Sequence, residues 1–154
     1  MFKGSKLGKV EPLQSVATDP ARLDSYTKAF SKQQLNFFSG TPYQFSHFRK
    51  TNGYANSSLD GLWLRGPYLH NGSVPSLSAL LMPPDQRPRS FLRGSMVLDQ
   101  KNGGFEASAC NRQVEKGYTC YDVREPGNGN AGHVWGTDLE PVQKEQLVAC
   151  LLTF

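Results

Sequence analysis

The sequence contains no isoleucine, and valine and threonine are scarce as well, with nine and seven residues among 154. Because β-branched residues favour strands, this scarcity argues against a β-sandwich or a barrel. No run of about 18 apolar residues occurs, which argues against a membrane span. The first ten residues also lack the apolar segment of a secretory signal. We therefore expect a mainly α fold with long irregular loops.

Several catalytic and binding motifs are missing. There is no C-x-x-C, and no pair of histidines has the spacing of a catalytic zinc site. The G-x-S-x-G of a hydrolase nucleophile elbow is absent too. The formal net charge is +4, but the basic residues are scattered, so nucleic acid is not the expected partner. A mildly basic surface is compatible with docking to an acidic partner.

Local signals predict three helices. Thr18-Asp19-Pro20 starts one that should run over residues 20–35. A short helix over 76–82 is capped by Ser76 and ended by two prolines. The last begins at Pro141, and its apolar residues form one stripe over 142–152. The aromatic-rich segment 41–76 is expected to be irregular but packed, and residues 83–136 are expected to be loop.

The three cysteines have different surroundings. Cys110 and Cys120 flank a short excursion of the long loop, and they could form a disulfide in an oxidising compartment or remain two free thiols. Cys150 falls in the last predicted helix, where we expect a buried, small apolar side chain.

The three histidines also differ. His47 lies between phenylalanines and is expected to be an ordinary packed or surface residue. His70 lies in the run GPYLHNGSVPSL, where proline and Asn-Gly fix a rigid turn. His133 lies in GNGNAGHVWGTDL, whose glycines let the backbone approach a flat ligand closely. A neutral imidazole in either place is a suitable iron ligand, although ordinary packing stays an open alternative for both.

These segments resemble a known family. Residues 51–54, 59–63, 66–77 and 132–139 are similar to the C-terminal part of periplasmic di-haem c-type cytochromes of the cytochrome c peroxidase and rubber-oxygenase superfamily. The resemblance runs over residues 18–154 and leaves 1–17 as a linker or the tail of an upstream region. It implies an incomplete cytochrome c-like domain that carries electrons through haem c. The C-x-x-C-H attachment motif of that family is absent from the sequence.

The missing motif leads to further expectations. The haem-bearing region should lie upstream in a longer protein that is exported to the periplasm, and the chain should exchange electrons with a redox partner protein. The family's last helix packs on the helix that carries the attachment motif. We therefore expect the isolated chain to be unstable or partly folded, with the 142–152 stripe exposed.

The resemblance also implies roles for individual residues. His133 matches the axial iron ligand of one branch, and Met82 lies close to the position of the methionine ligand in the peroxidase branch. The remaining expected haem contacts are His70, Trp63, Tyr68 and Trp135, with Arg65 as a propionate partner.

Other functions stay open. A relative of the electron-transfer function is peroxidase or oxygenase chemistry at a second haem. A different class is a haem-free binding or structural module that kept the scaffold and lost the cofactor. The last alternative is a truncated remnant without function.

Overall fold

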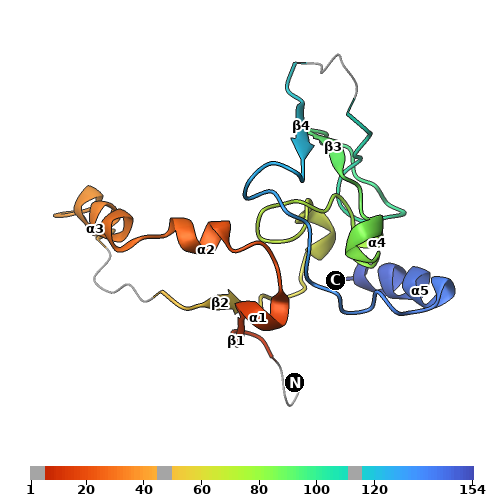
Figure 1. Ribbon diagram of the computed structural model, residues 1–154, viewed down its shortest axis with the longest axis horizontal. Helices are drawn as coiled ribbons and strands as arrows, with labels where there is room; N and C mark the ends of the chain where they lie inside the picture. Colours follow the sequence, from red (N-terminus) through yellow and green to blue (C-terminus); the bar gives the residue numbers. More distant parts are fainter. Residues whose placement is uncertain (1–5, 45–49, 111–115) are drawn as a thin grey trace.

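The computed structural model describes residues 6–44, 50–110 and 116–154. Figure 1 shows a body that contains the C-terminus and an arm, residues 21–37, that leads away from it. In chain order, the elements are β1 (Val10–Pro12), α1 (Leu13–Val16), α2 (Ala21–Ser25), α3 (Lys28–Phe37), β2 (Gly53–Ala55), the 3-10 turn η1 (Leu62–Leu64), α4 (Leu77–Leu80), the 3-10 turn η2 (Pro84–Gln86), β3 (Ser90–Arg93), β4 (Thr119–Asp122) and α5 (Pro141–Leu151).

The expected fold class, mainly α, is wrong. The helices are short, and the described residues also form two antiparallel two-stranded sheets, β1–β2 and β3–β4. In the second sheet Phe91 pairs with Tyr121, and both side chains are buried. Aromatic residues favour strands as β-branched ones do, so the lack of isoleucine does not prevent short ribbons. The expectation that 83–136 is entirely loop is therefore wrong as well.

The core lies in the body, around α4 and α5. Tyr68, Val74, Leu77, Ala79, Leu81 and Val148 form its buried cluster. The predicted helix at 76–82 is confirmed as α4, and the Ser76 hydroxyl accepts a hydrogen bond from the Ala79 amide at 3.1 Å. This capping bond satisfies one of the amides that a helix start leaves unpaired.

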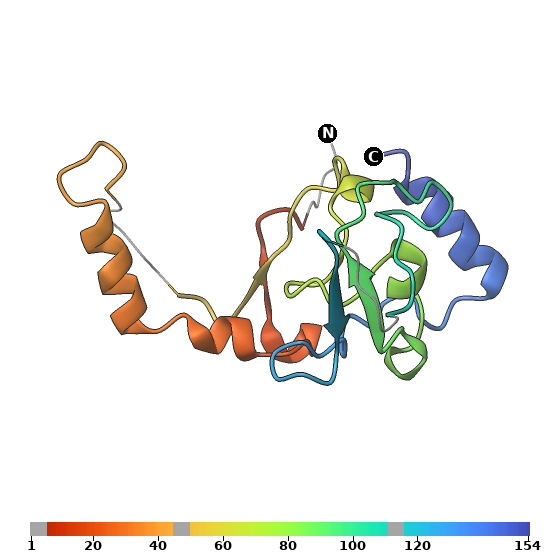
Figure 2. The same cartoon turned by 90° about the horizontal axis from the view of Figure 1, so that it is seen from above.

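The last predicted helix is confirmed as α5, which begins at Pro141. Apolar residues of its stripe pack on the core. Figure 2 shows the α5 ribbon beside α4. Val148 is buried, while Val142 is 63% exposed. The expectation of an exposed stripe is therefore correct at Val142 and wrong at Val148, because α4 covers the middle of the helix.

The helix predicted over 20–35 forms as two pieces. Thr27 interrupts it, and its hydroxyl accepts a hydrogen bond from the Phe30 amide at 3.2 Å, which starts α3 anew. Neither α2 nor α3 buries a residue, and Figure 2 shows both extending away from the body. No helix in the described ranges is long and apolar enough to cross a membrane.

Candidate functional site

His70 and His133 line the same cavity. It has a volume of about 430 Å³, which lies in the range of small-molecule sites. The two histidine motifs are thus brought together although 62 residues separate them in the chain. The lining residues come from β1, α1, β2, the segments that follow α1 and β2, and the two motifs. They are Glu11, Val16, Thr18, Tyr54, Ala55, Asn56, Ser57, Leu59, Leu69, His70, His133 and Trp135.

Four side chains of this lining have buried polar atoms without a hydrogen-bond partner. These atoms are Thr18 Oγ1, Tyr54 Oη, both ring nitrogens of His70 and Nδ1 of His133. Most buried polar atoms in proteins are paired, and leaving one unpaired costs roughly 1–3 kcal/mol. Their concentration around one cavity indicates a place where a ligand supplies the missing partners.

Both imidazoles are shifted toward the neutral form. Burial lowers the pKa of His70, although the negative charge of Asp19 acts in the opposite direction. Burial also lowers the pKa of His133, and the charge of Arg87 lowers it further. The Tyr54 ring stacks on His70 with centroids 4.9 Å apart. A neutral imidazole keeps a lone pair on one nitrogen and can therefore bind a metal.

The backbone around the cavity is strained. Three non-glycine residues of the described chain have positive φ, namely Ala17 at 54°, Leu69 at 64° and His133 at 47°. Leu69 and His133 line the cavity, and Ala17 lies between two lining residues. Such conformations are costly and persist where the surroundings enforce them, which is typical of functional sites.

The glycine-rich loop that carries His133 is tied to the His70 turn. The Asn71 side-chain amide donates to the Gly127 carbonyl at 3.1 Å and to the Gly129 carbonyl at 2.9 Å. A carboxylate oxygen of Asp19 accepts a hydrogen bond from the Gly129 amide at 3.3 Å. The two motifs therefore form one structural unit.

The N-terminal segment packs on the same loop. The His133 amide donates to the Val16 carbonyl at 2.8 Å. Gly132 is required at this contact, because a Cβ there would lie 2.4 Å from the Ala17 carbonyl oxygen. The domain boundary expected at residue 17 stays a prediction; Val16 before it and Thr18 after it both line the cavity.

Of the other predicted haem contacts, Trp135 lies at the cavity. Its ring meets that of His133 edge-on, with centroids 4.8 Å apart. Trp63 lies elsewhere and lines a separate cavity of about 320 Å³ with Leu152. Tyr68 belongs to the core. The structure thus places Trp135, but not Trp63 or Tyr68, beside the two imidazoles.

Arg65 and Met82 also lie away from this cavity. Arg65 donates to the carbonyls of Ser58 at 2.8 Å and Asp60 at 2.6 Å, so its guanidinium already holds a local turn. Met82 is 39% exposed and does not line the cavity. His47, expected to be an ordinary packed or surface residue, lies outside the described residues.

Sequence reasoning missed Thr18 and Tyr54 as cavity residues. Tyr54 lies within the resembling segment 51–54, but nothing there distinguishes its hydroxyl from that of a packed tyrosine. Thr18 was interpreted only as part of a helix start. Their unpaired buried hydroxyls identify both as residues of the candidate site.

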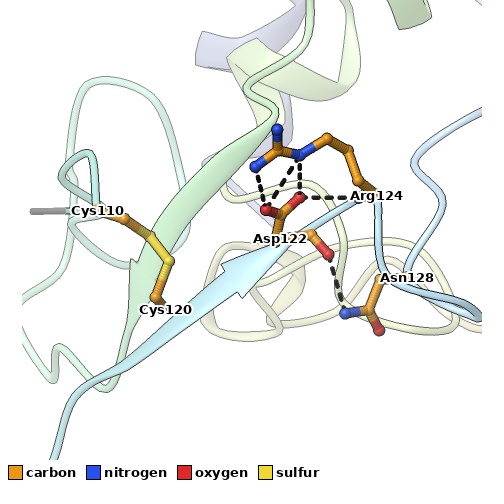
Figure 3. The surroundings of a disulfide bond; sticks show 5 residues. All are labelled: Cys110, Cys120, Asp122, Arg124 and Asn128. Atoms are coloured by element: carbon orange, nitrogen blue, oxygen red, sulfur yellow. Dashed lines mark hydrogen bonds and ion pairs between the residues drawn. A yellow bond between two sulfur atoms is a disulfide. The ribbon is translucent and has the colours of Figure 1, made fainter.

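Cys110 and Cys120 form a disulfide, so the alternative of two free thiols is wrong for this structure. Figure 3 shows the bond beside β4. In the same strand, the Asp122 carbonyl accepts a hydrogen bond from the Asn128 side-chain amide at 3.0 Å. This bond joins the β3–β4 sheet to the glycine-rich loop. Hydrogen bonds from Arg124 lower the pKa of the Asp122 carboxyl to about 2. Cys150 is exposed, which corrects the expectation that it is buried.

One comparison with known proteins indicates a family. A protein-family model described as RoxA-like, cytochrome c-like, matches residues 53–92, which include Tyr54 and His70. This match supports a cytochrome c-like family. Such a family implies haem c and suggests a haem-related electron-transfer module.

Two relatives come from Sinorhizobium fredii, strain NBRC 101917 / NGR234. The uncharacterized protein y4iJ is 34% identical over 160 residues, which cover 97% of this chain and 25% of the relative. The uncharacterized protein y4iM is 40% identical over 85 residues, which cover 53% of this chain and 19% of the relative. The chain therefore spans a quarter or less of these curated relatives.

Proposed function

We propose that this chain forms one side of a haem c site in a di-haem electron-transfer cytochrome and that His133 supplies an axial ligand to the iron. The observation that carries the proposal is the meeting of two imidazoles with unpaired buried ring nitrogens at one cavity, with His70 inside the segment that matches the cytochrome c-like family.

The cavity residues fit one face of a haem. His133 offers an imidazole that burial shifts toward the neutral form, and Val16, Leu59, Leu69 and Trp135 offer apolar wall. When bound, a haem iron with two protein ligands exchanges single electrons without an open position for substrate. In this arrangement His133 would hold the iron, Trp135 would pack edge-on against the His133 ring, and His70 would offer a hydrogen-bond donor from the same cavity lining. The position of Met82 favours His133 as the ligand.

The covalent half of the site requires other residues. The sequence has no C-x-x-C-H, so the cysteines and the histidine that would attach the haem would come from another region, which we place upstream in a longer protein. The greater length of the curated relatives supports this arrangement. The Cys110–Cys120 disulfide supports export to the periplasm, because disulfides persist in oxidising compartments. We expect a redox partner protein there, rather than nucleic acid.

A second candidate function is a haem-free module that binds a small polar ligand. The unpaired hydroxyls of Thr18 and Tyr54 favour it, because they offer hydrogen bonds to a polar ligand. The haem-binding experiment described next distinguishes the two candidate functions.

The test uses a soluble peptide that carries covalent haem c, supplies one axial histidine and leaves the sixth position of the iron open. Added to the full chain, it should give the absorption and electron-paramagnetic spectra of low-spin, six-coordinate iron. His133→Asn should abolish that signature. Asn is chosen because it tolerates the positive φ at this position. Met82→Leu is the matched control and should leave the spectrum unchanged.

Other results would contradict the proposal. Loss of the low-spin signature in Met82→Leu and its retention in His133→Asn would make Met82 the ligand. No complex with the wild-type chain would refute the haem site and favour the haem-free module.

A further inference from the structure

Arg87 is buried, with 2% of its surface exposed, and it faces backbone carbonyls instead of a carboxylate. Its Nε donates to the Met82 carbonyl at 3.1 Å. Its two terminal nitrogens donate to four others, in Asn130 at 2.5 Å, Gly132 at 2.9 Å, Leu80 at 3.2 Å and His133 at 3.0 Å. All five donors of the guanidinium therefore point at main-chain oxygens.

The five carbonyls belong to two parts of the molecule. Leu80 and Met82 lie at the end of α4, where a helix leaves its last carbonyls unpaired. Asn130, Gly132 and His133 lie in the glycine-rich loop. The guanidinium thus joins the loop to the most buried helix of the body. Burial lowers the pKa of Arg87, and burying such a charge is costly unless its donors are all satisfied.

The loop contacts surround the backbone of the proposed ligand. The guanidinium holds the carbonyls before and after His133 Cα, while the Val16 carbonyl accepts from its amide. A residue at φ 47° needs such enforcement, because left-handed backbone is unfavourable for a side chain with a Cβ. Fixing the backbone on both sides of Cα also fixes the direction in which Cβ and the ring leave it.

We propose that Arg87 is the positioning residue of His133: its guanidinium sets the backbone that directs this imidazole into the cavity. That the positioned ring is an iron ligand rests on the proposed function, whereas the positioning itself does not. Lysine cannot replace the guanidinium, because an ammonium has three donors and no planar fork that reaches both groups of carbonyls.

The experiment compares Arg87→Lys with the wild-type full chain by NMR of the histidine rings, without haem. In the wild type, the ring of Trp135 lies against His133 and should displace its ring-proton resonances. In Arg87→Lys these resonances should move toward those of an unrestrained histidine, while the His70 resonances stay in place. Arg124→Lys is the matched control, because Arg124 is exposed and its partner is Asp122, so neither ring should change. Unchanged His133 resonances in folded Arg87→Lys would overturn the proposal.

If Arg87→Lys does not fold, the wild-type chain still gives an answer. The guanidinium N–H signals of Arg87 and the ring signals of His133 are followed in urea below the midpoint of global unfolding. Loss of both sets at the same urea concentration supports the proposal. Displacement of the His133 signals while those of Arg87 remain protected overturns it.

The haem c peptide then separates this inference from the proposed function. Mutation of a residue that orients a metal ligand typically lowers metal affinity roughly 10- to 100-fold. Arg87→Lys should therefore raise the Kd of the complex between the haem c peptide and the chain by roughly that factor. A wild-type chain that fails to bind the peptide refutes the haem site, while the ring resonances still decide whether Arg87 positions His133.

Discussion

Two helices of this chain contrast in length and burial. α3 in the arm has ten residues and buries none of them, whereas α4 in the body has four residues and buries Leu77 and Ala79. Both begin with a hydroxyl side chain that accepts a hydrogen bond from the third amide of the helix. Local capping therefore starts a helix in either place, but only tertiary packing makes the helix part of the core.

The same contrast locates the candidate site. No residue of α2 or α3 lines the histidine cavity, although Arg22 at the base of the arm donates to the His70 carbonyl at 2.6 Å. The loop of His133 is tied through Arg87 to the end of α4. The site thus depends on the short helix and not on the long one.

The largest effect should come from truncating buried and exposed apolar residues in the two helices. Leu77→Ala removes a side chain that is 1% exposed and should lower the free energy of unfolding by about 3 kcal/mol. Phe37→Ala removes a larger side chain that is 81% exposed and should change it by less than about 0.5 kcal/mol. Urea denaturation measures both, and equal losses would show that the arm is as tightly packed as the body.

Alkaline pH should destabilise the body through Tyr68. Burial raises the pKa of its phenol to about 12 in the folded chain, against an ordinary value near 10. The contribution of Tyr68 to the free energy of unfolding is fully present below pH 10, because the phenol is then protonated in both the folded and the unfolded chain. It is lost as the pH rises from about 10 to 12, where only the unfolded chain ionises, at a cost of about 2 kcal/mol.

The control for this pH effect is Tyr68→Phe. This variant loses the hydrogen bond from the phenol to the Leu62 carbonyl and should be less stable at neutral pH. Its stability should fall less steeply above pH 10, as urea midpoints at each pH would show. The same slope in both proteins would contradict the assignment to Tyr68.

The smallest effect should distinguish the two helix caps. Ser76→Ala should lower the free energy of global unfolding by about 1 kcal/mol, because α4 unfolds only with the core. Thr27→Ala should cost α3 a similar amount locally and leave global unfolding unchanged. Hydrogen exchange at the Ala79 and Phe30 amides measures each loss, since these are the amides that the caps hold. If Thr27→Ala lowered the free energy of global unfolding, the arm would have to unfold cooperatively with the body.

Sequence signals predicted the elements whose causes are local. The capping residue and the following prolines predicted α4, and Pro141 predicted the start of α5. The positions of Cys110 and Cys120 allowed the observed disulfide but did not decide between it and two free thiols. The strands were missed because each has three or four residues, too few for an alternating pattern to emerge from a glycine-rich stretch.

The site was predictable only in part. The rigid turn at His70 and the glycines before His133 marked both residues, but their meeting at one cavity depends on contacts between distant segments. Arg87 gave no signal of its role, since its partners are main-chain carbonyls, which every residue has. The unpaired hydroxyls of Thr18 and Tyr54 are likewise a property of packing and not of sequence.

The hydrogen bond from the His133 amide to the Val16 carbonyl has a consequence for insertions and deletions. It closes a loop of more than a hundred residues, which includes the whole arm and the disulfide excursion. The entropy of loop closure grows only with the logarithm of length, and each doubling of a flexible loop adds about 0.6 kcal/mol. Insertions of many residues in the arm should therefore be tolerated while the geometry of the cavity is retained.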